Sequence, residues 1–224
     1  LAGLGLLFLQ SIAGSRSAFE TEARIAHRLL SQRAVQHEAV LSTLNLMQTS
    51  IDPRLPAVYP QFLKIWQRQT KQPWPASLSF GNEKASGLPQ LAQAELSEGL
   101  FWITIAPPPE RAPDSIAYAL EISLPLMLPW AEWPFGSSPE AAQRARVWLE
   151  YGSSRWLIHP GDTHGEIQRF SFRKTLAAES QPFDLVAEYS YQAADLPWWP
   201  MLLWLLFWSM ALGLGRSALR QNQA

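Results

Sequence analysis

A run of twenty residues without a single charge lies near the C-terminal end, from Leu196 to Gly215. Asp195 precedes this run and Arg216 follows it. At about 1.5 Å per residue, twenty helical residues cross a hydrocarbon core of about 30 Å. The run therefore predicts a transmembrane helix over 196–215, with Trp198 and Trp199 at the outer interface. The alternative is a helix buried in a protein core, but uncharged runs of this length are rare in soluble domains.

The charges around this run predict its orientation. Arg216 and Arg220 follow it, and cytoplasmic flanks of membrane helices are enriched in basic residues. We therefore expect 216–224 to begin a cytoplasmic linker, and 15–195 to lie in the periplasm as a domain of a bacterial inner-membrane protein. Residues 1–14 are apolar but too short to span a bilayer alone. We interpret them as the end of a truncated first transmembrane helix, with a signal-peptide remnant as the alternative.

Composition excludes several classes of function. The 224 residues include 18 basic and 19 acidic ones, so no overall field attracts nucleic acid. There is no cysteine, which excludes disulfides, thiolate catalysis and cysteine metal sites. His159, Asp162, His164 and Glu166 are grouped in one turn but lack the spacing of helical metal ligands. We expect no metal, no cofactor and no catalytic residue.

A long helix is predicted over 15–51, because residues 17–50 contain neither proline nor glycine and are rich in helix formers. Asp52-Pro53 ends it. Apolar side chains three and four residues apart predict a seam against a partner helix or against the domain's own body, and we expect a homodimer through this helix. The seam comprises Phe19, Ala23, Ala26, Leu30, Leu41 and Leu44. His37 falls on the seam, where a packing role is more common than a pH-reporting one.

A sheet-rich core is predicted over 76–191, after a short helix over 57–69. Alternating apolar residues predict its strands. The predicted strands are Ala76–Phe80, Leu100–Ala106, Ile116–Leu124, Ala145–Tyr151, Arg155–His159, Ile167–Thr175 and Phe183–Tyr191. Gly152-Ser153 predicts a tight hairpin, and a short helix is predicted to run through Arg144. The fold class expected from this order is α+β, with the long N-terminal helix packed on a mixed, mostly antiparallel PAS-like sheet of the Cache kind, flanked by transmembrane helices.

Two stretches resemble the extracytoplasmic input regions of proteobacterial sensor histidine kinases that carry cytoplasmic PAS modules. The first runs from Phe19 to Gln48 and contains Ala26-His27-Arg28-Leu29-Leu30-Ser31-Gln32-Arg33-Ala34-Val35-Gln36-His37-Glu38. The second runs from Phe170 to Trp199 and contains Phe172-Arg173-Lys174-Thr175-Leu176-Ala177, Gln181-Pro182-Phe183 and Asp195-Leu196-Pro197-Trp198. Neither stretch is a catalytic signature.

The resemblance implies the signal-sensing domain of a two-component sensor histidine kinase, which relays a ligand or an envelope condition across the membrane. In such kinases the phosphorylated histidine and the nucleotide-binding domain follow the second membrane helix, so we expect no enzyme activity in the segment ending at Ala224. One alternative is the input domain of a chemoreceptor or a diguanylate cyclase. Another is a membrane-anchored structural protein, such as a regulator of polysaccharide chain length.

A binding pocket for a small organic acid is the site that the sequence favours. Arg173 is the candidate anchor, because the planar guanidinium binds a carboxylate through two parallel hydrogen bonds. Tyr118, Trp102 and Trp148 are the candidate aromatic lining from other strands. The alternative is that Arg173 is solvent-exposed and that the aromatic residues belong to the core.

Overall fold

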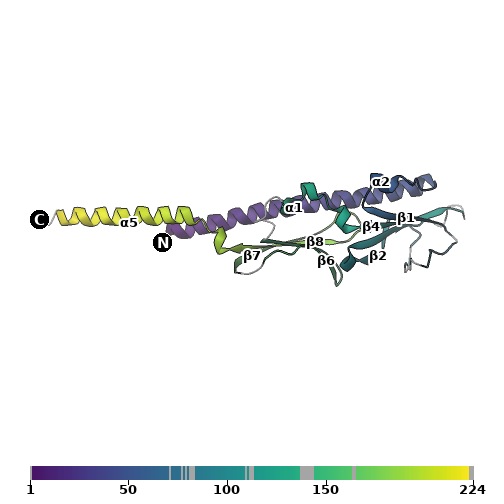
Figure 1. The fold of residues 1–224 in the computed structure, drawn as a ribbon. Coiled ribbons are helices and arrows are strands. Elements are labelled where there is room, and N and C mark those ends of the chain that lie inside the picture. The colour runs from purple at the N-terminus through teal and green to yellow at the C-terminus, as the bar shows by residue number, and fades with distance from the viewer. Residues whose placement is uncertain are drawn as a thin grey trace.

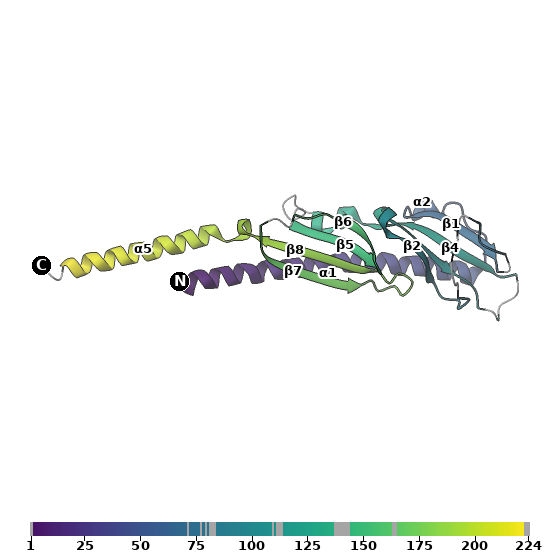
Figure 2. The same cartoon turned by 90° about the horizontal axis from the view of Figure 1, so that it is seen from below.

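One helix, α1 (Ala2–Met47), runs along two β-sheets that follow each other down its length (Figure 1). With 46 residues it is about 69 Å long. The fold comes from a computed structural model that describes residues 2–70, 72–76, 78, 80, 84–108, 110, 114–136, 144–162 and 165–221. Figure 2 shows both sheets on the same side of α1, with the two chain termini at one end of the molecule.

The first sheet lies beside the C-terminal half of α1 and has the strand order β1-β4-β3-β2, with every neighbouring pair antiparallel. Its strands are β1 (Phe62–Gln69), β2 (Gln90–Glu95), β3 (Leu100–Ile105) and β4 (Ile116–Ser123). The short helix α2 (Leu55–Val58) connects the end of α1 to β1. A 3-10 turn, η1 (Leu96–Glu98), joins β2 to β3.

The second sheet lies nearer the chain termini and has the order β6-β5-β8-β7, again antiparallel throughout. Its strands are β5 (Ala145–Tyr151), β6 (Ser154–His159), β7 (Glu166–Thr175) and β8 (Asp184–Gln192). Between the sheets run α3 (Leu124–Met127), η2 (Trp130–Glu132) and η3 (Pro134–Gly136). After β8, η4 (Ala193–Asp195) leads into the final helix, α5 (Trp198–Gln221).

The core is the layer between α1 and the two sheets. All six seam residues predicted on α1 are buried, from Phe19 through Leu44, and they pack against the protein's own sheets. The sheets contribute every second residue of their strands, as in Phe101, Ile103 and Ile105 of β3, which are fully buried. At about 25 cal/mol per Å² of apolar surface, this layer supplies the main favourable free energy of folding.

The structure confirms six of the seven predicted strands with small shifts at their ends, and it confirms the hairpin at Gly152-Ser153. The predicted strand over 76–80 is wrong, because its described residues 76, 78 and 80 are not in a strand. The short helix predicted over 57–69 is also wrong beyond Val58, since 62–69 form β1. The short helix predicted to run through Arg144 falls almost entirely on residues 137–143, which lie outside the described ones.

The expected single sheet is corrected to two separate four-stranded sheets. No ladder joins β1–β4 to β5–β8 within the described residues. The sequence pattern could not show this division, because alternation marks each strand's two faces and carries no record of which strands pair. The coarse expectation, an α+β fold with a long N-terminal helix on antiparallel sheet, is confirmed.

The final helix α5 forms where a helix was expected, and it packs against the start of α1. A Cβ atom placed on Gly3 would lie 2.5 Å from the ring of Trp204, so the two helices approach closely at this point. Across the described residues, no helix combines the length and the apolar character needed to cross a membrane. The transmembrane helix predicted over 196–215 is therefore not supported as a spanning helix.

Candidate functional site

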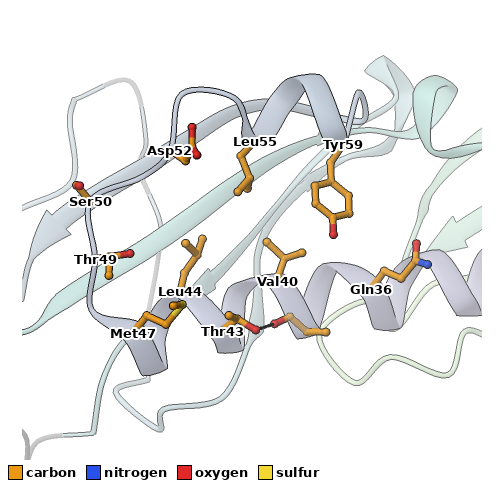
Figure 3. A pocket seen from close by; sticks show the side chains of 11 residues that line it. Gln36, Val40, Thr43, Leu44, Met47, Thr49, Ser50, Asp52, Leu55 and Tyr59 are labelled. Atoms are coloured by element: carbon orange, nitrogen blue, oxygen red, sulfur yellow. Dashed lines mark hydrogen bonds between the residues drawn. The ribbon is translucent and has the colours of Figure 1, made fainter.

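A cleft of about 460 Å³ opens at the end of α1 farthest from the chain termini (Figure 3). Its walls are the last turns of α1, the loop after it, and α2 with Tyr59. The lining residues are Gln36, Ala39, Val40, Thr43, Leu44, Met47, Thr49, Ser50, Asp52, Leu55 and Tyr59. We call this site the α1–α2 cleft. Its size falls within the 300–1,000 Å³ range typical of pockets for small molecules.

The lining combines an apolar floor with a polar rim. Figure 3 shows Val40 and Leu44 of α1 facing Leu55 and Tyr59 across the opening. The rim carries hydroxyl and amide groups, and Asp52 is the one charged residue among the lining residues. Such a lining suits a small molecule with an apolar body and a few hydrogen-bonding groups. Because the single charge is negative, the cleft favours a neutral or cationic molecule over an organic acid.

Hydrogen bonds attach the loop wall of the cleft to the first sheet. Gln48 ends α1 in the left-handed region, with φ of 50°, and its side chain spans two partners. Its amide nitrogen donates to the carbonyl oxygens of Asn45 (2.7 Å) and Ile116 (3.3 Å), and its side-chain oxygen accepts from the Ile116 backbone nitrogen at 2.6 Å. The Tyr118 hydroxyl donates to the carbonyl oxygen of Thr49 at 2.8 Å. These hydrogen bonds therefore hold the loop wall of the cleft in place without a ligand.

Asp52 and Tyr59 hold the opposite wall. One carboxylate oxygen of Asp52 accepts a hydrogen bond from the Arg54 backbone nitrogen at 2.8 Å, which forms the turn into α2. The ring of Tyr59 stacks on Phe62 at the start of β1, with 5.1 Å between ring centroids and an interplanar angle of 23°. The sequence predicts a helix end at Asp52-Pro53. It also predicts a helix over 57–69 that would include Tyr59, so it does not predict that Tyr59 lines a cleft.

Arg173, the predicted anchor, is on β7 and its side chain is 56% exposed. Its guanidinium forms ion pairs with Glu150 of β5 and with Asp184 of β8, the latter at 3.6 Å. The indole nitrogen of Trp148 donates to the same Glu150 carboxylate at 3.4 Å. Arg173 and Trp148 thus meet on the second sheet, but the charge of Arg173 is already balanced by two carboxylates.

Tyr118 and Trp102 lie on the first sheet, away from Arg173 and on opposite faces of that sheet. Tyr118 faces α1 and is fully buried, and this burial raises the pKa of its hydroxyl. Trp102 faces away from α1, and its indole nitrogen has no hydrogen-bond partner among the described residues. The structure therefore does not bring the four predicted residues together into one pocket.

No cluster of three or more histidine, aspartate or glutamate side chains among the described residues could hold a metal ion. His164, which the sequence groups with Glu166, lies outside the described residues. The fold and the cleft together define an α+β protein with two antiparallel sheets on one helix and a cleft at the end of that helix. Comparisons with protein-family models, with curated proteins and with solved structures found no match.

Proposed function

We propose that this chain is a signal-sensing domain that binds a small neutral or cationic molecule in the α1–α2 cleft. One observation carries the proposal: the same helix lines the cleft with its last turns and packs against α5 with its first turns. About 40 residues separate Gly3, which faces Trp204 of α5, from Leu44 in the cleft, and this corresponds to about 60 Å of helix. A change in the packing of α1 at the cleft would therefore reach the other end of the molecule.

Hydrogen bonds between α1 and the second sheet would pass such a change in packing to that sheet. The His27 ring nitrogen Nε2 donates to the carbonyl oxygen of Thr175 at 2.8 Å, and the Glu38 carboxylate accepts from the Ser180 backbone nitrogen at 2.8 Å. A helix held by discrete hydrogen bonds shifts between distinct arrangements rather than sliding continuously. A ligand would need only a few kcal/mol of differential affinity to select one of them.

The far end of α1 meets the segment that leads into α5. Arg144 forms an ion pair with Asp195, and the Asp195 carboxylate also accepts from the Gln192 backbone nitrogen at 2.8 Å. The Trp198 indole donates to the carbonyl oxygen of Ala193 at 2.9 Å. These contacts tie the start of α5 to the second sheet, so that a shift of the sheet against α1 would reorient α5.

The surface of α5 supports contact with lipid. Its large apolar side chains are exposed on every side of the helix, rather than along one stripe that a single partner could cover. They include Trp198, Trp199, Leu202, Leu203, Leu205, Leu206, Phe207, Trp208, Met210, Leu212 and Leu214. We place this surface in or on a bacterial inner membrane, with 15–195 on the periplasmic side. In this arrangement the protein serves as the input domain of a membrane-associated sensor, and the resemblance to sensor histidine kinases supports that role.

A thermal-shift screen on the full chain in detergent tests the ligand site. The panel contains neutral and cationic amino acids and small amines, with small carboxylic acids as the opposing set. A cationic hit should stabilise the parent, lose about tenfold in affinity in Asp52→Asn, and keep its affinity in the exposed control Glu98→Gln. Hits confined to carboxylic acids, or a hit unaffected by both Asp52→Asn and Tyr59→Ala, would contradict the proposal.

A further inference from the structure

His37 lies at the point where α1 meets both sheets, and its side chain is fully buried. Its Nδ1–H donates to the side-chain oxygen of Gln181, in the connection between β7 and β8, at 3.2 Å. Its Nε2 accepts from the side-chain nitrogen of Gln61, next to β1, at 3.4 Å. The Gln181 amide nitrogen donates to the carbonyl oxygen of Ala34 at 3.0 Å, which fixes the orientation of that amide. The imidazole is therefore neutral and bridges the two sheets.

The ring of His37 also packs against the side chains that lead to the α1–α2 cleft. Phe62 lies edge-on to it, with 5.3 Å between ring centroids, and Tyr59 stacks on Phe62. Phe101 lies 6.5 Å from His37 and contacts Phe183, beside β8, at 5.0 Å. Tyr59, which lines the cleft, is thus connected to His37 through the ring of Phe62. His37 is in turn connected to the second sheet through its hydrogen bond to Gln181.

Protonation of His37 would break its hydrogen bond with Gln61. An imidazolium has two N–H donors and no acceptor, so its Nε2–H would face the N–H donors of Gln61. Arg33 on α1 is the charged group that acts on His37, and it disfavours a second positive charge. From the first sheet the ring faces Phe62, Phe101 and the Gln61 amide, and from the second-sheet side it faces the Gln181 amide. None of these four side chains titrates.

We propose that His37 is the coupling residue between the two sheets: neutral, it joins the α1–α2 cleft to the second sheet, and proton uptake breaks its link to Gln61 and uncouples them. The part of this inference that concerns the cleft rests on the proposed function. Burial lowers the pKa of His37 to about 4, with the hydrogen bond that His37 donates to Gln181 opposing this and Arg33 adding to it. The bridge is therefore intact at neutral pH and opens only in acid.

Hydrogen exchange of backbone amides between pH 3.5 and 7, on the full chain in detergent without ligand, tests the coupling. After correction for intrinsic exchange rates, amides of β1 and of the 176–183 connection should lose protection together, with a midpoint near the pKa of His37. His37→Asn keeps a donor toward Gln181 and cannot take up a proton, so its protection should not vary over this range. Gln61→Glu places a carboxylate beside Nε2, which accepts a hydrogen bond from the imidazolium but not from the neutral ring, so in this variant protection should rise instead of fall when His37 takes up a proton.

Three results would overturn the coupling. One is an unchanged acid transition in His37→Asn, another is a loss of protection in acid in Gln61→Glu like that of the parent, and the third is loss of protection in only one of the two segments of the parent. If His37→Asn does not fold, Gln61→Glu still decides the question through the direction in which its protection changes. Because no ligand is present, a negative result contradicts the coupling, while the ligand site is judged separately by the thermal-shift screen.

Discussion

The hydroxyl oxygens of Ser11 and Tyr191 lie 2.9 Å apart, which joins the start of α1 to the end of β8 across 180 residues of sequence. Both hydroxyls also lie within hydrogen-bond distance of the carbonyl oxygen of Asp195, at 3.3 and 3.2 Å. Tyr191 is fully buried. The three groups form the joint from which α5 departs, so a shift of α1 would pass to the start of α5 through this joint.

Tyr191→Phe should loosen that joint without disturbing the core. The substitution keeps the buried ring and removes one hydroxyl, and we expect a loss of about 1 kcal/mol in stability together with faster amide exchange over 193–198. Urea unfolding and hydrogen exchange measure the two effects. Tyr151→Phe, at a residue that is 42% exposed, is the matched control and should change neither. Unchanged exchange over 193–198 in Tyr191→Phe would contradict the role of the joint.

Stability should fall in acid because of His37. Its pKa is about 4 in the folded state and about 6.5 in the unfolded chain, so the unfolded state binds the proton first as the pH falls. Stability is complete above about pH 6.5 and declines by up to about 1.4 kcal/mol per pH unit until the pH nears 4. Urea titrations of the parent and of His37→Asn at several pH values measure this slope. The difference in stability between them should shrink steadily from pH 7 to pH 4, and a constant difference would contradict the assignment.

Thr104→Val should stabilise the protein. Thr104 is fully buried on β3, and its hydroxyl has no hydrogen-bond partner among the described residues. Replacing an unpaired buried hydroxyl by a methyl group of similar shape removes a desolvation cost, and we expect a gain of about 1 kcal/mol. Thr43→Val, at an exposed helical position, is the control and should stay within about 0.5 kcal/mol of the parent. A loss of stability in Thr104→Val would show that the hydroxyl has a partner, such as a buried water molecule.

Gly3→Leu should separate the start of α1 from α5. A side chain at this position would collide with the ring of Trp204, whereas a Cβ atom on Gly5 meets nothing within 4 Å. Chemical crosslinking between the two helices in detergent should therefore fall in Gly3→Leu and stay at the parental level in Gly5→Leu. Equal crosslinking in both variants would show that the contact between the helices is absent in solution.

The long helix and most strands could be predicted because their signals are local. The seam of α1 follows from the spacing of its apolar residues from Phe19 onward, and β4 and β8 follow from the alternation of their apolar residues. The strand β1 escaped prediction because Phe62, Leu63, Ile65 and Trp66 also fit one face of a helix. In β1 the bulge between Phe62 and Lys64 disturbs the alternation that would have identified a strand.

The candidate site was harder to predict than the fold, because its chemistry depends on pairings across strands. The partners of Arg173 are Glu150 and Asp184, and the ladders that bring them together are not visible in the spacing of the sequence. The α1–α2 cleft, in contrast, is built from residues 36–59 alone. In the sequence, the cleft corresponds to the polar loop after α1, followed by Pro56 and Tyr59. This pattern indicates a cleft only when α2 is known to end at Val58.

The distance between the start of α1 and the start of α5 tests whether α1 carries a signal from the α1–α2 cleft to α5. The chain has no cysteine, so spin labels on Ala13→Cys and Trp199→Cys report this distance without background labelling. Double electron–electron resonance is measured with and without the compound that gives the largest thermal shift. We predict that the mean distance changes by about 1–2 Å in the parent and does not change when Tyr59→Ala is added. An unchanged distance in the parent with the compound bound would contradict a signal carried along α1.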